Sequence, residues 1–178
     1  MEIRPEDIRV EPICFVDIKP KVEGLMLHIG CGDGRMKGYI NIDLHNKNGE
    51  ASWDAAKIPL NDCTVSIIQC HQTIEHFEFN RLPAIFAEWY RVLKPGGEIH
   101  ITTPDIIASC QLVIDNPMNQ WYIARLFGNQ SHDGQFHKWG FKPGDFGNYL
   151  GFAGFSIVET GRYIENKIEP YLYTRAVR

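Results

Sequence analysis

The sequence predicts an α/β fold in which a mostly parallel sheet packs against helices, and three observations support this prediction. Short apolar runs bounded by glycine or turn residues recur at 25–29, 39–42, 65–70 and 98–104, as in buried strands. Apolar residues recur every three or four positions from Leu82 to Leu93, which is the period of an amphipathic helix. After a short helix at 143–153, strand-like runs at 155–160 and 171–177 close the chain.

Between these elements, residues 105–127 are expected to form one or two helices with a break at Asn116-Pro117, and Asn80 is a candidate cap for the helix that follows it. The last two strands are expected to be joined through residues 161–170. The first 24 residues are expected to be an extended lead-in with a short strand at 13–18. At 178 residues the chain should form a single domain, 1–178.

A glycine-rich turn follows the first apolar run, with glycines at the alternate positions Gly30, Gly32 and Gly34. Glycine adopts positive φ angles and lets a ligand contact bare backbone. The second run ends on Asp43, whose carboxylate can accept two hydrogen bonds from a ribose diol. This layout predicts a nucleotide site. The alternative is a tight turn between two strands with a solvated aspartate.

The spacing of this turn separates two kinds of nucleotide site. Dinucleotide-binding folds have G-x-G-x-x-G, whereas this chain has G-x-G-x-G. Asp33 inside the turn would repel a phosphate but not a cationic ligand. Only nine residues separate Ile29 from Tyr39, too few for a full crossover helix, so we expect a loop or a single turn there.

Composition excludes several classes of protein. The chain is 44% hydrophobic and 22% charged, with a net charge of −4 and a pI of about 6.0. Without a basic run, no nucleic-acid surface is expected. Five cysteines without a C-x-x-C pair indicate reduced thiols in a cytoplasmic protein. No apolar run approaches the ~18–20 residues of a membrane span, and the N-terminus does not resemble a signal peptide.

Residues 29–34 (IGCGDG) and 41–44 (NIDL) resemble motifs I and II of the class I S-adenosylmethionine (SAM) methyltransferases. The resemblance implies a Rossmann-like seven-stranded methyltransferase sheet, mostly parallel with an antiparallel last strand, with helices on both faces and a truncated first helix. It also implies SAM as cofactor. The residues implied to bind SAM here are Gly30, Cys31, Gly32, Asp33 and Gly34 near its methionine part, and Asp43 with Leu44 at the ribose.

Three further stretches resemble the type 11, ubiquinone-biosynthesis-like methyltransferases, and the resemblance covers roughly residues 24–177. Residues 91–97 (RVLKPGG) match a signature whose role is a helix stop and a turn into the next strand. Residues 53–62 resemble D-A-x-x-L-P-F-x-D, which implies that Asp54 meets the adenine amino group beside the Ala55 backbone. Residues 75–77 resemble an E-H-h box. The alternative for 53–62 is a surface turn held by Pro59.

The strand at 65–70 should also lead into the site. Ligands of α/β sheets lie beyond the carboxyl ends of the strands, so Cys70 and His71 are expected to edge the cofactor pocket. His71 and His76 are five positions apart, do not share a helix face and have no third ligand near them in the sequence. We therefore expect no metal site.

The loop at 128–141 is too polar for a core and too aromatic for a plain linker. Loops with such side chains on a rigid scaffold often form substrate sites. Similar small methyltransferases carry a "Q-x-H … H-K/R-x-x-F" loop here, which implies Gln130, His132 and His137 as substrate-side residues. The alternative is a loop that packs its aromatic side chains onto the sheet edge.

The predicted function is methyl transfer from SAM to an oxygen or nitrogen nucleophile of a small molecule, such as a sugar or another metabolite. If the acceptor arrives protonated, histidine suits the role of base. His137 is the first candidate, followed by His71 and His76. Alternatives are a SAM- or nucleoside-binding module, a SAM-cleaving enzyme, and an NAD(P)-dependent oxidoreductase, which the glycine spacing and Asp33 disfavour. No membrane partner is expected, and the oligomeric state is not predicted.

Overall fold

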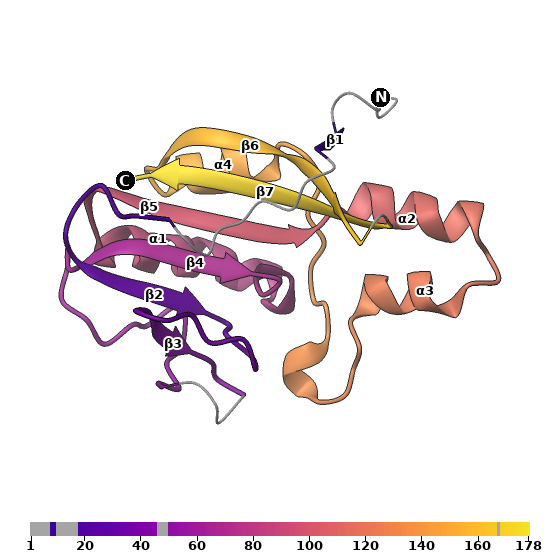
Figure 1. The fold of residues 1–178 in the computed structure, drawn as a ribbon, viewed down its shortest axis with the longest axis horizontal. Coiled ribbons are helices and arrows are strands. Elements are labelled where there is room, and N and C mark those ends of the chain that lie inside the picture. Colours follow the sequence, from indigo (N-terminus) through magenta and orange to yellow (C-terminus); the bar gives the residue numbers. More distant parts are fainter. Residues whose placement is uncertain (1–7, 10–17, 46–49, 167) are drawn as a thin grey trace.

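A computed structural model describes residues 8–9, 18–45, 50–166 and 168–178, so most of the strand expected at 13–18 lies outside the described residues. The strands form one seven-stranded sheet in the order β1-β6-β7-β5-β4-β2-β3 (Figure 1). Their bounds are β1 Ile8–Arg9, β2 Leu25–Ile29, β3 Ile40–Ile42, β4 Val65–His71, β5 Leu93–Pro104, β6 Ser156–Glu165 and β7 Glu169–Val177.

The sheet is mixed, as predicted. Strands β3, β2, β4 and β5 are parallel neighbours, and β7 lies antiparallel between β5 and β6. Six of the strands have three residues or more, and the seventh is the two-residue β1, which pairs parallel with β6. The carboxyl ends of β2, β3 and β4 therefore meet at one end of the sheet, where a ligand is expected.

The connection from β2 to β3 contains no helix in any of its residues, all of which are described, and this confirms the truncated crossover. Backbone bonds hold it instead: the N–H groups of Gly30 and Cys31 both donate to the carbonyl of Ile42, at 2.8 and 3.1 Å. The side chain of Asn41 pairs with Met36, accepting from its N–H at 2.8 Å and donating to its carbonyl at 3.1 Å. The glycine turn is thereby fixed to the end of β3.

Two helices cover one face of the sheet, α1 (Leu82–Val92) and α4 (Asp145–Phe152). Their apolar side chains join those of the strands in one buried core, which includes Leu27, Ile68, Ile99, Phe86, Trp89 and Leu150. The expected cap Asn80 is wrong, because it lies within a short 3-10 turn, Phe79–Arg81, that leads directly into α1. Arg81 takes the cap position without a capping side-chain hydrogen bond.

The opposite face of the sheet is buried but polar. It carries His28, Gln69 and His100 on neighbouring strands, alternating with the apolar residues of the core face. A helix meets this face at its end, where the guanidinium of Arg125 in α3 (Gln120–Phe127) lies 5.1–5.2 Å from the rings of Trp121 and Tyr171. Helices were expected to cover this face as well, but among the described residues a helix contacts it only at its edge.

The remaining helix, α2 (Ile106–Asp115), is separated from α3 at the predicted break. The connection expected at 161–170 is shorter than predicted, because β6 and β7 continue to Glu165 and Glu169 as a long hairpin. The strand continues beyond the first turn signal, Gly161, because Tyr163 and Ile164 pair with Tyr171 and Pro170 of β7.

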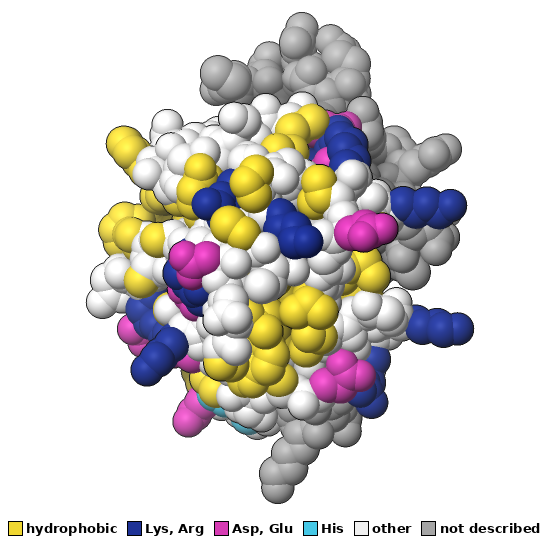
Figure 2. Space-filling view, turned by 90° about the vertical axis from the view of Figure 1, so that its left-hand side faces the viewer, with side chains coloured by type: hydrophobic (Ala, Val, Ile, Leu, Met, Phe, Trp, Pro, Cys, Tyr) yellow, Lys and Arg dark blue, Asp and Glu magenta, His cyan; other side chains and the backbone are white. Residues whose placement is uncertain are grey.

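The end of the sheet where the parallel strands begin shows hydrophobic groups separated by charged side chains, and almost no histidine (Figure 2). The histidine-rich loop is on the other side of the molecule. Among the described residues, no helix combines the length and the apolar character that a membrane span requires.

Candidate active site

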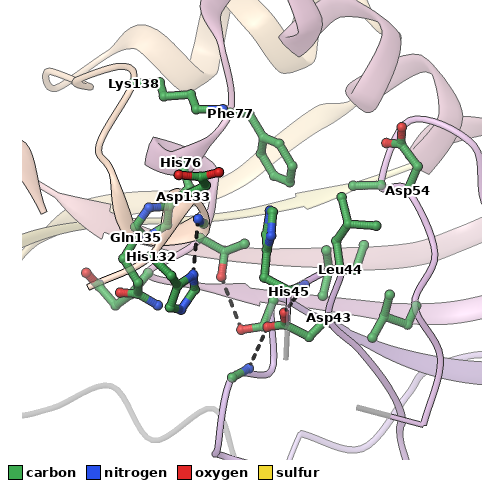
Figure 3. A pocket seen from close by; sticks show the side chains of 18 of the residues that line it. Asp43, Leu44, His45, Asp54, His76, Phe77, His132, Asp133, Gln135 and Lys138 are labelled. Carbon is green, nitrogen blue, oxygen red and sulfur yellow. Dashed lines mark hydrogen bonds between the residues drawn. The ribbon is translucent and has the colours of Figure 1, made fainter. Parts of the chain in front are cut away.

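A cleft of about 620 Å³ lies at the carboxyl ends of β2, β3 and β4. One wall is formed by the glycine turn and the residues after β3, and the other by the loop at 129–138 (Figure 3). Of the residues predicted from the sequence, the cleft is lined by Gly30, Gly32, Asp33, Asp43, Leu44, Asp54, Ala55, His71, His76 and His132. Cys31, Gly34, Cys70, Gln130 and His137 are not part of the lining.

The glycine turn has two positions that require glycine, for different reasons. Gly30 has a φ of +72°, and a Cβ there would stand 2.1 Å from the side chain of Thr73. Gly32 has a φ of +48° but faces open space. Thr73 in turn donates its hydroxyl to the carbonyl of His71 at 2.8 Å. The turn is therefore pressed against the end of β4 at Gly30 and left open to a ligand at Gly32.

Asp43 follows β3 and is fixed by backbone donors. Its Oδ2 accepts from the N–H of Gly32 and its Oδ1 from the N–H of His45, each at 2.9 Å. Each carboxylate oxygen can accept a second hydrogen bond. The carboxylate is thus oriented at the cleft wall, beside the exposed side chain of Leu44.

Asp54, the residue predicted to meet adenine, has a strong partner already. Nη2 of Arg81 contacts both of its oxygens, at 2.6 and 2.7 Å, and the N–H of Ala56 donates to Oδ1 at 2.9 Å. The bond from Ala56 and the Arg81 charge lower the pKa of Asp54. The carbonyl of Ala55 accepts from the indole N–H of Trp89 at 3.1 Å, so this segment is fixed to α1.

The end of β4 places its two predicted residues on opposite sides. The side chain of Cys70 is fully buried in the core, and burial raises the pKa of its thiol well above the usual value. His71 lines the cleft, with its ring bonded to Thr102 at 3.1 Å and to Gln69 at 2.8 Å. Burial lowers the pKa of His71 to about 3, so its imidazole is neutral. The four cysteines within the described ranges are all free thiols.

The loop at 128–141 closes the other wall of the cleft. The ring centroids of His132 and His45 lie 6.0 Å apart across the cleft. The N–H groups of Lys138 and Trp139 both donate to the carbonyl of Glu75, at 2.8 and 3.1 Å. The loop is therefore a fixed part of the site, held against the residues that follow β4.

His76 and His137 form a pair behind this wall. Their ring centroids are 4.9 Å apart, and the planes cross at 71°. Nδ1 of His76 donates to the carbonyl of Phe136 at 3.0 Å. Burial lowers the pKa of both, that of His137 to about 4 with a further contribution from His76. Both imidazoles are consequently neutral near pH 7, and only His76 reaches the cleft surface.

Comparison with known proteins agrees with this geometry. Residues 27–101, which hold the glycine turn, Asp43 and the strand pair β4–β5, match the family model described as a methyltransferase domain of type 11. Over this segment the chain is similar to a methyltransferase domain. The comparisons agree with the predicted SAM-dependent class, with the predicted fold class and with SAM as cofactor. The ubiquinone-biosynthesis-like subtype stays a prediction. No curated protein matches the sequence significantly.

Several solved structures share the fold of this chain. A SAM-dependent methyltransferase from Methanosarcina mazei is 17% identical with a TM-score of 0.65, covering 96% of this chain and 99% of the other. One from Archaeoglobus fulgidus is 17% identical with a TM-score of 0.64, covering 87% and 86%. A 1,6-didemethyltoxoflavin-N1-methyltransferase from Burkholderia thailandensis, solved with its substrate and S-adenosylhomocysteine, is 14% identical with a TM-score of 0.59, covering 86% and 70%.

Several lining residues of the cleft carry no local sequence pattern. Arg81 is the clearest example, because its contact with Asp54 joins positions 27 apart. Gln72 and Thr73 could have been found, since they directly follow a strand end that was predicted to face the site. Others that sequence reasoning missed are His45, Trp53, Phe77, Glu78, Asn129, Ser131, Asp133, Gly134, Gln135 and Lys138.

Proposed function

We propose that this protein transfers a methyl group from SAM to an oxygen or nitrogen atom of a small molecule. The observation that carries the proposal is one cleft with two different walls. One wall holds a carboxylate oriented by a glycine turn, and the other a fixed loop with histidine and amide side chains. A module that only bound a nucleoside would have no need of the second wall.

The cofactor would lie along the first wall. In this arrangement the ribose hydroxyls donate to the carboxylate of Asp43, and the methionine part runs over Gly30–Gly34, with Asp33 facing the cationic sulfur. The adenine lies near Leu44 and Ala55. Asp54 reaches its amino group only when Arg81 releases at least one carboxylate oxygen, because both oxygens contact the guanidinium.

The acceptor would enter from the second wall, near His132. A lone pair of its oxygen or nitrogen attacks the methyl carbon, the bond from carbon to sulfur breaks, and that electron pair stays on sulfur as S-adenosylhomocysteine. Alignment of the two atoms supplies much of the rate, and the acceptor's proton must leave. We propose that removal of this proton depends on His76 and His137. His71 is the weakest of the three candidates, because an imidazole with a pKa near 3 holds a proton poorly.

The remaining parts of the proposal follow from the surface and the thiols. A net charge of −4 suits a small-molecule acceptor better than a nucleic acid. The free cysteines within the described ranges suit a reducing compartment such as the cytoplasm. Gln130 and His137 lie outside the cleft lining, so we assign direct acceptor contact to His132 first.

The test is incubation of the purified protein with SAM labelled in its methyl group and a fractionated metabolite extract. The proposal predicts label in a new small molecule, lost in His76→Ala and His137→Ala while both variants still bind S-adenosylhomocysteine in calorimetry. Binding without any labelled product would support the nucleoside-binding module instead. Release of adenosyl fragments without an acceptor would support SAM cleavage.

A further inference from the structure

Glu75, His76 and His137 bring three potential metal ligands together on the acceptor side of the cleft. One ligand atom from each lies within 4.8 Å of the other two. Glu75 and His76 belong to the 3-10 turn η2 (Ile74–His76) that follows β4, whereas His137 comes from the loop at 128–141. This cluster contains His76 and His137, whereas the pair considered from the sequence was His71 and His76. We propose that Glu75, His76 and His137 bind one divalent transition-metal cation such as zinc.

The backbone holds these three residues in place. Hydrogen bonds hold the chain on both sides of His137. On one side, Lys138 and Trp139 donate to the carbonyl of Glu75. On the other, His76 donates to the carbonyl of Phe136. In metal sites, a histidine commonly donates one ring N–H to a carbonyl, which orients the other nitrogen toward the metal. His76 already has this outer partner, so its ring is oriented before a cation enters.

Glu75 is a buried carboxyl close to the two imidazoles. Its side chain is only 2% exposed, and its Oε2 accepts from the hydroxyl of Thr103 at 3.0 Å. Burial raises its pKa to about 7, and its hydrogen bonds and the charge of Arg125 offset only part of this rise. A bound cation would favour the ionised carboxylate, and neutral imidazole is the form in which histidine binds metals.

The ligand set favours zinc or a similar ion over magnesium or calcium. Imidazole nitrogens suit zinc and its first-row neighbours, whereas magnesium and calcium prefer oxygen ligands. Bonds of about 2.0–2.2 Å would draw the three donors closer together than they lie now. Two imidazoles and one carboxylate leave a coordination position open, and His76 connects the cluster to the cleft surface, from which we infer that the acceptor can reach this position.

This inference rests on the proposed function and narrows its substrate class. A hydroxyl or carboxyl oxygen bound at the open position would lose its proton more easily, as metal-bound water does. The two histidines would then act through the cation. The acceptor would be an alcohol or an acid, methylated on oxygen.

Metal binding can be measured without knowing the acceptor. The tag-free full chain, freed of metal with a chelator, is titrated with zinc chloride in a calorimeter, and with cobalt(II) while its visible absorption is recorded. We expect one equivalent of either ion per chain and a zinc-dependent rise in the melting temperature. Glu75→Gln, His76→Ala and His137→Ala should each weaken zinc binding at least tenfold, and His132→Ala, a histidine of the same cleft outside the cluster, should not.

Other outcomes overturn the inference. If zinc does not bind, or binds equally to all four variants, the cluster is not a metal site. If zinc binds through His132 and not through Glu75, the site is a different one. Each variant is also titrated with S-adenosylhomocysteine: retained binding alongside lost zinc binding shows that the cluster has changed without damage to the cofactor site. Failure of the wild type to bind S-adenosylhomocysteine would count against the proposed function, whatever zinc does.

Discussion

The N–H of Gly32 donates to Oδ2 of Asp43 at 2.9 Å, so the glycine turn and the acid after the next strand form one connected unit. Gly32 is one of the two turn positions with a positive φ, and Asp43 carries the carboxylate on which ribose binding would depend. The two were paired from sequence by their order along the chain. The structure adds that the backbone of one orients the side chain of the other.

The three glycines of the turn should respond differently to alanine. Gly30→Ala should lower the free energy of unfolding by more than about 2 kcal/mol, because its Cβ would overlap Thr73 and its φ is positive. Gly32→Ala should lower it by about 1–2 kcal/mol from backbone strain alone. Gly34→Ala is the matched control, since its Cβ would meet only an ordinary contact at 3.6 Å and should cost little. Urea unfolding of the three variants measures this order, and equal losses in all three would contradict it.

The ion pair between Arg81 and Asp54 should oppose cofactor binding. Arg81→Ala would free the carboxylate of Asp54, so affinity for S-adenosylhomocysteine should rise a few-fold, whereas Asp54→Asn should weaken it. Stability should change by no more than about 1 kcal/mol, because the side chains are 37% and 44% exposed. Calorimetry on both variants tests this. Weaker binding in Arg81→Ala with no change in Asp54→Asn would mean that the guanidinium, and not the carboxylate, contacts the cofactor.

Stability should fall on acidification below pH 6.5 in chelator-treated protein. Burial lowers the pKa of His71 to about 3 and those of His100 and His137 to about 4. The unfolded chain takes up these protons near pH 6.5 and the folded chain does not, so their stabilisation is present above pH 6.5 and lost as the pH falls toward 4. Each group contributes a slope of at most about 1.4 kcal/mol per pH unit.

Glu75 acts in the opposite direction over part of the same range. Its pKa is raised to about 7, so its contribution is fully present below about 4.5 and is lost as the pH rises through 7. Three histidines against one carboxyl still give a net loss on acidification. Urea unfolding at several pH values from 7.5 to 4.5 measures the slope of the free energy of unfolding against pH. His137→Ala should reduce this slope by the contribution of one histidine. A stability that stays constant from pH 7.5 to 5 would contradict these pKa values.

Much of the fold was predictable because its signals are local. The apolar runs gave the strands, the period of residues 82–93 gave α1, and the count of nine residues after Ile29 excluded a crossover helix. The errors arose where tertiary contacts decide the outcome. Asn80 has the chemistry of a cap, but the chain enters α1 through a 3-10 turn, and Gly161 lies inside a strand because β7 pairs with it.

The site divides in the same way. Gly30, Gly32 and Asp43 belong to one local motif and line the cleft as predicted. The Arg81–Asp54 pair and the contact between His76 and His137 join distant positions, so no sequence spacing announces them. Cys70 was assigned to the pocket rim from its place at a strand end, but strand alternation turns its side chain into the core.

The most direct test of the central assignment is calorimetric titration of wild type and Asp43→Asn with S-adenosylhomocysteine. A hydrogen bond to a charged group contributes about 1.5–3 kcal/mol, so the account predicts one site per chain in the wild type and roughly ten- to a hundredfold weaker binding in the variant. Equal affinity in the two proteins, or no binding to the wild type, would contradict the assignment of this cleft to SAM.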